Sequence, residues 1–228
     1  MSQKNIIQTP LYKGLQYLYA FLMTNIYFLI GNIFIIFTFF SVPASFSSIL
    51  LYYIALIPMG PSLIALFYTM GKLHREKTIQ PTKDFFQSYR KNFFIAIRYW
   101  LIQLTLIIVL AVDIVYLMSK GYVLWTVISV IALCIVLIAT INGFAILATF
   151  EVNVKNVIIF SLLMIKNYFL KALLSLTTLL SFAIIWYGYP SEATLGIFSI
   201  VVYFLMRTNY AALFDLKKNY SSESGDQL

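Results

Sequence analysis

The feature that most constrains this 228-residue chain is a series of long apolar stretches with few charges. A helix crosses a bilayer with about 20 mostly apolar residues. Leu, Ile and Phe occur all round these stretches rather than on one stripe, which is typical of helices surrounded by lipid or by other apolar helices. The sequence therefore predicts an all-α polytopic membrane bundle with six spans, at 19–42, 46–70, 95–118, 122–148, 169–187 and 193–214.

The overall composition agrees with a membrane protein. Charged residues make up only 11% of the chain, whereas soluble globular proteins have about 25%. We therefore expect one membrane-embedded helical domain over residues 1–218. The polar residues 219–228 are expected to be a disordered tail.

The positions of the basic residues predict the orientation. Every Lys and Arg except Lys120 falls on one side of the six-span arrangement. Cytoplasmic loops carry the excess of positive charge in membrane proteins. We therefore expect both termini in the cytoplasm, and the net charge of +8 is first of all a topology signal.

The second apolar stretch is interrupted by Pro58, Gly60 and Pro61. Proline lacks the N–H that would bond the carbonyl four residues earlier, so each proline frees one carbonyl. Freed carbonyls must face protein or a wet cavity. We expect a broken second span whose break faces Asn32 of the first span, with the Asn32 amide donating to a freed carbonyl. The break is either a packing kink or a functional hinge with a small polar pocket.

Two longer cytoplasmic connections, 72–94 and 150–171, predict interfacial helices. In the first of them, aromatic residues recur at helical spacing while Lys83, Arg90 and Lys91 point elsewhere. Such a helix lies at the inner membrane surface with its bases on anionic headgroups. These three residues are therefore the candidate anionic-lipid contacts.

Polar residues inside the spans identify faces that point into the bundle, because each must find a partner in lipid. Asn32 and Asn142 are the candidates for a polar bundle interior, and Asn25 and Asn209 belong to the same class. Asp113 is the one clearly intramembrane acid. It either forms a structural pair with Lys120 or water at the outer boundary, or it serves a coupling proton or a substrate.

Two segments carry a family resemblance. "PMGPSLIALFYTMGKLHREKTIQPTKDFFQSYRKNFFIAIRYWL" and the later "FAILATFEVNVKNVIIFSLLMIKNYFLKALLSL" resemble the YesL-like integral membrane family, over roughly residues 17–215. The chain departs from that pattern after Ser41-Val42-Pro43, where "ASFSSILLYYIAL" adds half a span before the glycine turn. The resemblance implies a bacterial plasma-membrane protein, accessory to carbohydrate uptake, with no catalytic residues to carry over.

The sequence lacks the motifs that would indicate catalysis or cofactor binding. His74 is the only histidine, so a helical pair of metal-binding histidines cannot form, and neither a Gly-x-Ser-x-Gly elbow nor a phosphate-binding loop occurs. We expect no enzyme activity, metal, cofactor or nucleic-acid partner. Two functions stay open: an accessory protein beside a membrane transport complex, and a small transporter or channel. Against the transporter, the sequence indicates no row of acids and no second broken helix.

Overall fold

The computed structural model describes residues 10–43 and 45–225, and this part of the chain is helical without a strand. The expected all-α bundle is confirmed. A single 3-10 turn, η1 (Phe46–Ser48), accompanies the α-helices. These are α2 (Pro10–Gly31), α3 (Ile33–Ser41), α4 (Ile49–Leu56), α5 (Met59–Glu76), α6 (Pro81–Lys91), α7 (Phe93–Ser119), α8 (Val123–Leu147), α9 (Val154–Asn167), α10 (Phe169–Gly188) and α11 (Pro190–Gly225).

Four segments are long and apolar enough to cross a membrane unbroken: α7, α8, α10 and Gly196–Leu216 of α11. If each of two bent helix pairs is one span, the number rises to six. They are Leu11–Gly31 with Ile33–Ser41, which meet at 64°, and Phe46–Leu56 with Met59–Glu76, which meet at 48°. All six apolar stretches thus form helices, and the first of them is broken as well as the second.

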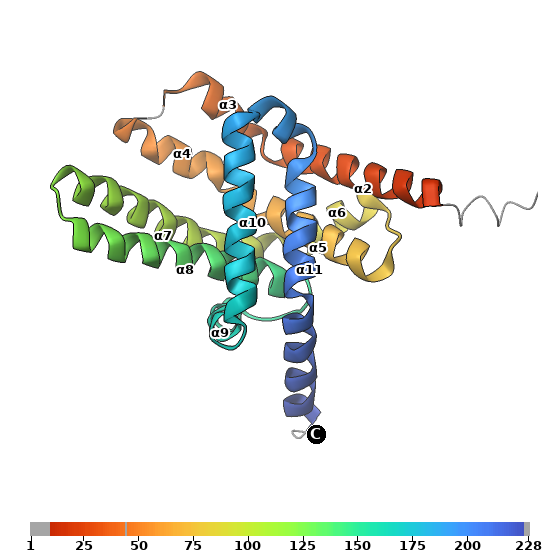
Figure 1. Cartoon of the computed structure of the whole chain (residues 1–228). Helices are drawn as coiled ribbons and strands as arrows, with labels where there is room; N and C mark the ends of the chain where they lie inside the picture. Colours follow the sequence, from red (N-terminus) through yellow and green to blue (C-terminus); the bar gives the residue numbers. More distant parts are fainter. Residues whose placement is uncertain (1–9, 44, 226–228) are drawn as a thin grey trace, which may run out of the picture.

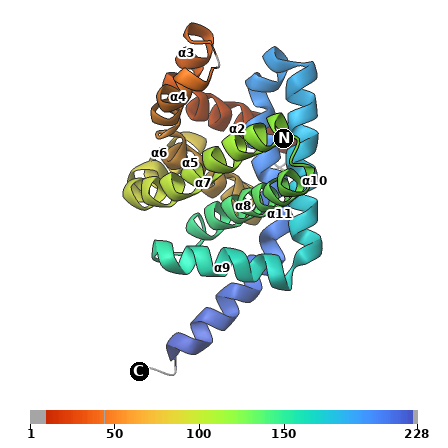
Figure 2. The same cartoon turned by 90° about the vertical axis from the view of Figure 1, so that its left-hand side faces the viewer.

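The helices run in two main directions. In Figure 1, the α7–α8 hairpin extends to one side and α2 to the other, while α10 and α11 run side by side across them. Figure 2 shows α10 still upright after a quarter turn, while the lower part of α11 slants toward the C-terminus and α7 and α8 point toward the viewer. Membrane helices tilt by at most about 40° from the bilayer normal. Helices that tilt in opposite directions can therefore cross at a large angle and still span one bilayer.

The core surrounds α5. Its central residues, from Ile64 to Leu66, are completely buried, and α6, α7, α8 and α11 all pack against this helix. The ends of α7 and α8 that meet at the turn between them are exposed rather than buried. Val115, Tyr116 and Trp125 are examples. In a bilayer this apolar exposure is covered by lipid.

The two longer connections, 72–94 and 150–171, do contain helices, α6 and α9, but the surroundings of α6 differ from the expectation. Phe85 is 1% exposed and packs against the ring of Tyr27, with 5.9 Å between centroids. Phe86, at 41% exposure, is left at the surface. The apolar face of α6 therefore packs mainly on protein rather than on lipid.

The C-terminal segment also differs from the expectation. Helix α11 continues to Gly225, so most of the tail expected to be disordered is helical, and residues 226–228 lie outside the described part. Adding a residue to an existing helix forms one more hydrogen bond without a new nucleation step. A polar composition alone therefore did not predict where this helix ends.

Candidate functional site

The break in the second span lies between α4 and α5, as expected. Pro58 immediately precedes α5 with φ −65°, and Pro61 lies in the first turn of that helix. The carbonyls of Ile54 and Ile57 would have lost their donors in a straight helix. Here they accept from the N–H groups of Ile57 and Gly60, three residues further on, at 3.2 and 3.3 Å. A tighter turn thus satisfies the carbonyls that the prolines free.

Trp100, on the neighbouring helix α7, packs against this break. Its indole Nε1 donates to the carbonyl of Leu56, the last residue of α4, at 2.8 Å. A Cβ on Gly60 would lie 2.7 Å from Cβ of Trp100, so glycine is what allows this close approach. Sequence reasoning did not identify Trp100, because an aromatic residue near a span end also suits the membrane boundary.

The first span breaks at Asn32, which contradicts the expectation of a single broken helix. The Asn32 amide donates to the Phe28 carbonyl of its own helix at 2.7 Å, not to the second break. An asparagine side chain competes with the backbone for local hydrogen bonds and so weakens a helix where it stands. The expected bond from Asn32 to a carbonyl freed by the prolines is therefore wrong.

The two breaks nevertheless adjoin. A Cβ on Gly31, just before the first break, would lie 2.5 Å from Oγ of Ser62 and 3.5 Å from its Cβ. Ser62, just after the second break, is fully buried and donates to the carbonyl of Pro58 at 3.1 Å. We call Gly31, Asn32, Pro58, Gly60, Ser62 and Trp100 the break pair. Its one unsatisfied side-chain atom is Oδ1 of Asn32, which is buried without a hydrogen-bond partner in the described structure.

The other span asparagines connect helices, as expected. Asn142 of α8 donates to the Ser161 carbonyl of α9 at 3.4 Å, and its Oδ1 is buried without a partner in the part described. Asn25 reaches the Thr194 carbonyl of α11 at 2.7 Å. Asn209 of α11 donates to Ser175 of α10 at 3.1 Å. Asn142 thus stabilises the α8–α9 contact and makes no hydrogen bond to the break pair.

Asp113 lies exposed on the outer part of α7. The ion pairs of the described residues do not include one between Asp113 and Lys120. Lys120 instead lies over the ring of Tyr116, with 6.0 Å from Nζ to the centroid. The structural pair proposed between Asp113 and Lys120 is therefore not formed, and the Asp113 side chain is exposed.

The candidate lipid contacts on α6 are all exposed. Lys91 forms an ion pair with Glu151, and the hydrogen-bonded ammonium lowers the pKa of that carboxyl. Lys83 and Arg90 have no ion pair within the described residues and remain available to headgroups.

A buried ion pair that the sequence did not indicate connects α5 and α6. Asp84 is 3% exposed, accepts from Nζ of Lys72 at 2.8 Å, and accepts from the N–H of Gln80 at 3.0 Å. The pair lies beside a polar hollow of about 470 Å³ that includes Lys83 and Gln87. An acid in the first turn after Pro81 was the signal, because carboxylates there bond to free N–H groups at helix starts.

Comparison with known proteins gives a family-model match over part of the chain. A family model described as "Protein of unknown function, DUF624" matches residues 21–114. The match runs from α2 to the outer part of α7, so it contains the whole break pair and α6. It includes the first of the two segments on which the YesL-like resemblance rests, but not the second. No curated protein and no solved structure matches the chain.

Proposed function

We propose that this chain is a non-enzymatic, multi-pass protein of a bacterial plasma membrane that assists or regulates a carbohydrate-uptake system. The apolar helices support the membrane assignment. The resemblance of 58–101 and 144–176 to the YesL-like family supports the link to carbohydrate uptake. The geometry supports an accessory role for the reason given next.

The observation that carries the proposal is the closure of the break pair. Discontinuous helices of transporters leave unwound backbone and helix ends free to hold substrate or ions. Here Trp100 donates a hydrogen bond to the Leu56 carbonyl, and Ser62 donates one to the Pro58 carbonyl. Gly31 packs closely against Ser62, and Gly60 packs closely against Trp100. Both breaks are thus filled by protein, which suits a scaffold better than a substrate path.

One observation favours the alternative, a small solute transporter. Paired broken helices are a recurrent design of transporters, and the break at Asn32 is a feature that the sequence did not indicate. Oδ1 of Asn32, at one of the breaks, is buried without a hydrogen-bond partner in the described structure and would be free to bond a solute if the breaks opened.

Crosslinking in native membranes, followed by mass spectrometry, tests the accessory role. We expect a transport permease or its ATPase to be captured by the wild-type chain. The same transport protein should still be captured when an excess of an unrelated membrane protein is added to compete for non-specific contacts. If no transport protein is captured and the purified chain alone moves sugars into liposomes, the accessory proposal is wrong and the transporter is favoured.

Labelling with a membrane-impermeant thiol reagent tests the topology. In a Cys134→Ser background, we expect Ser119→Cys at the α7–α8 turn and Gly188→Cys at the end of α10 to react from outside intact cells. Gln87→Cys on α6 should not react. These three positions are exposed, whereas Ser88 is buried and would not report. Reaction at only one of the two outer positions would show that only one of the crossed hairpins spans the bilayer.

A further inference from the structure

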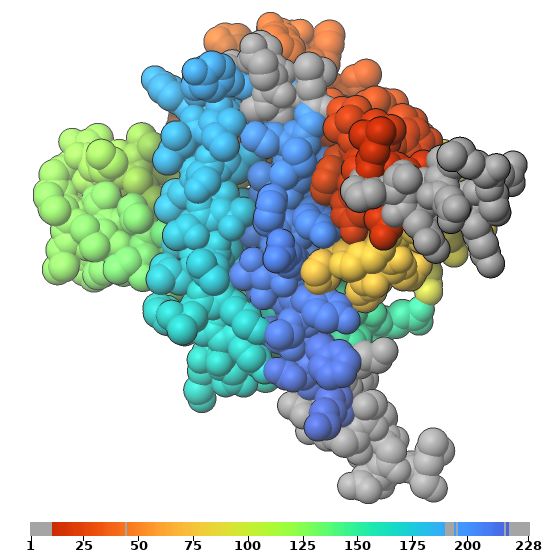
Figure 3. Space-filling model, turned by 45° about the vertical axis from the view of Figure 1, so that its right-hand side comes forward, coloured from red at the N-terminus to blue at the C-terminus, as the bar shows by residue number. Residues whose placement is uncertain are grey.

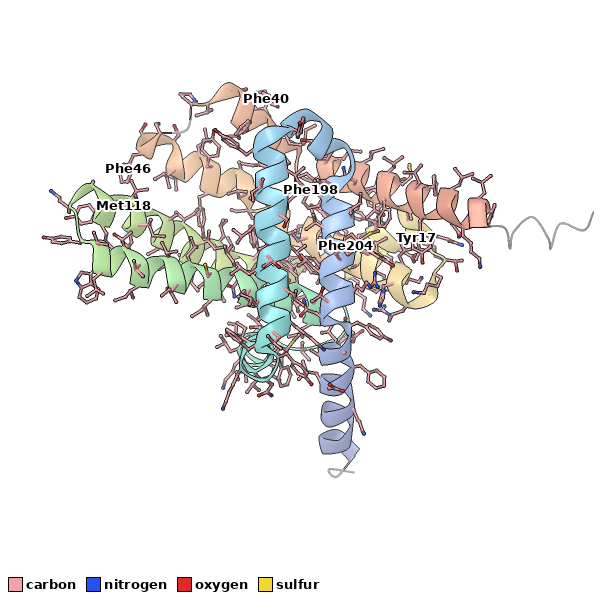
Figure 4. The ribbon with its side chains drawn as sticks, in the orientation of Figure 1. Tyr17, Phe40, Phe46, Met118, Phe198 and Phe204 are labelled. Atoms are coloured by element: carbon pink, nitrogen blue, oxygen red, sulfur yellow. The ribbon has the colours of Figure 1, made fainter. Side chains whose placement is uncertain are left out.

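A cluster of positive charge forms where the end of α5 meets the middle of α11. It consists of His74 and Arg75 at the end of α5, Lys77 just after that helix, and Arg207 of α11, and we call it the basic cluster. In Figure 3 the end of α5 (gold) contacts α11 (blue) beneath α2 (red). Side-chain nitrogen atoms gather at this junction below Tyr17 in Figure 4.

Specific contacts build the cluster. The ring of His74 packs edge-on against Tyr203 and Tyr210 of α11, with centroids 5.8 and 5.1 Å apart. A Cβ on Gly71 would lie 3.4 Å from Nη1 of Arg75 and 2.5 Å from Cε of Met206, so Arg75 folds toward α11. Nζ of Lys77 donates to the backbone carbonyl of His74 at 2.7 Å.

Acidic side chains do not neutralise this charge. The ion pairs of the described residues join Lys72 to Glu76 and Asp84, and Lys91 to Glu151, and none includes a member of the basic cluster. Asp215 of α11 accepts a hydrogen bond from the Tyr168 hydroxyl at 2.6 Å. Arg75, Lys77 and Arg207 therefore have no ion-pair partner among the described residues.

Two further observations indicate a ligand. Arg207 lies within the apolar segment Gly196–Leu216, and an arginine at membrane depth normally has a partner or a functional role. Nδ1 of His74 is buried without a hydrogen-bond partner in the described part of the chain. A buried polar atom without a partner costs free energy, so a group that supplies one is favoured.

We propose that the basic cluster binds a phosphate group at the membrane boundary. Arginine matches phosphate oxygens with two parallel hydrogen bonds, and the two tyrosine rings suit the depth of headgroups. The phosphate belongs either to an anionic phospholipid or to free phosphate. The basic cluster is separate from Lys83 and Arg90, which project from the surface of α6.

Because His74 is the only histidine, its imidazole NMR signals report on this site alone in the purified full chain. We would titrate short-chain phosphatidylglycerol, short-chain phosphatidylcholine and inorganic phosphate. We expect the signals to shift with phosphatidylglycerol and not with phosphatidylcholine. An equal shift with inorganic phosphate at the same concentration would assign the site to free phosphate. No shift with either anion, or equal shifts with both lipids, would overturn the proposal.

Variants test whether the arginines hold the phosphate. The double variant R75Q/R207Q should weaken binding about tenfold or more, since each charge-assisted hydrogen bond contributes about 1.5–3 kcal/mol. The matched control K155Q/K166Q removes two exposed charges from α9 and should leave binding unchanged. If R75Q/R207Q does not fold, R75K/R207K keeps the charge and removes the planar fork, and it should still bind more weakly. Wild-type affinity in the folded arginine variant would contradict the proposal.

Discussion

The two breaks of the bundle differ in how they are built and how they are closed. The break at Pro58 is imposed by the backbone itself and is closed from another helix by the indole of Trp100. The break at Asn32 has no proline, bonds its amide within its own helix, and leaves Oδ1 without a partner. Contact with a neighbouring helix fixes the backbone geometry of the Pro58 break. The geometry of the Asn32 break depends on a hydrogen bond within its own helix, which can be exchanged for another. The proline break is therefore the more rigid of the two, and any motion should begin at Asn32.

The largest effect should come from removing the indole that closes the proline break. Trp100→Ala removes a nearly buried ring and the donor to the Leu56 carbonyl. We expect the free energy of unfolding in detergent to fall by about 3–5 kcal/mol. Trp125→Ala, at 60% exposure on the α8 end, is the matched control and should change it by at most about 0.5 kcal/mol. Equal losses would show that Trp100 has no special role.

Alanine substitutions at Gly60 and Gly31 compare how tightly the two breaks are packed. Gly60→Ala meets the rigid stem of Trp100 at 2.7 Å, and we expect a loss of about 1–3 kcal/mol. Gly31→Ala meets only the Ser62 hydroxyl at 2.5 Å, which can rotate, so its loss should be smaller. Thermal unfolding of the single variants checks the order.

A double variant provides the control for Gly31. In a Ser62→Ala background the close hydroxyl is gone and the next atom, Cβ, is 3.5 Å away, an ordinary contact. Gly31→Ala should then have almost no further effect. A cost that persists in this background would mean that another neighbour crowds Gly31.

Replacing Pro58 and Pro61 together with alanine should change stability by about 1 kcal/mol or less, because both prolines already fit the start of a helix. The carbonyls beside them have donors without needing the proline N–H. If the Pro58 break is only a packing kink, carbohydrate uptake by cells that carry the double variant should stay at the wild-type level. A stable double variant without uptake would instead identify a hinge.

The smallest effect on stability is expected at Asn32. Asn32→Leu loses the bond to the Phe28 carbonyl but also removes the unsatisfied Oδ1, and the two changes oppose each other. We expect a net change below about 1 kcal/mol in thermal unfolding. A full loss of sugar uptake at unchanged stability would favour the transporter over the accessory protein.

The sequence predicted the proline break because the missing N–H is a property of the residue itself. It did not predict the break at Asn32, since an asparagine in an apolar stretch equally suits a bond between helices, as Asn25 and Asn209 show. Helical spacing predicted α6 but could not tell whether lipid or protein covers each aromatic residue. Phe85 and Phe86 are adjacent in sequence, and only packing by other helices separates them.

The contact between the two breaks is the central claim, and a disulfide tests it most directly. A Cβ at Gly31 would lie 3.5 Å from Cβ of Ser62, close to the separation of about 3.5–4.5 Å found in disulfides. We would place Gly31→Cys and Ser62→Cys in a Cys134→Ser background and oxidise native membranes. The account predicts that the two thiols join within one chain, as shown by mass spectrometry of the linked peptides. Gly188→Cys with Ser62→Cys is the control and should not join, because nothing lies within 4 Å of a Cβ at Gly188. Free thiols at both Gly31→Cys and Ser62→Cys under oxidation would contradict the account.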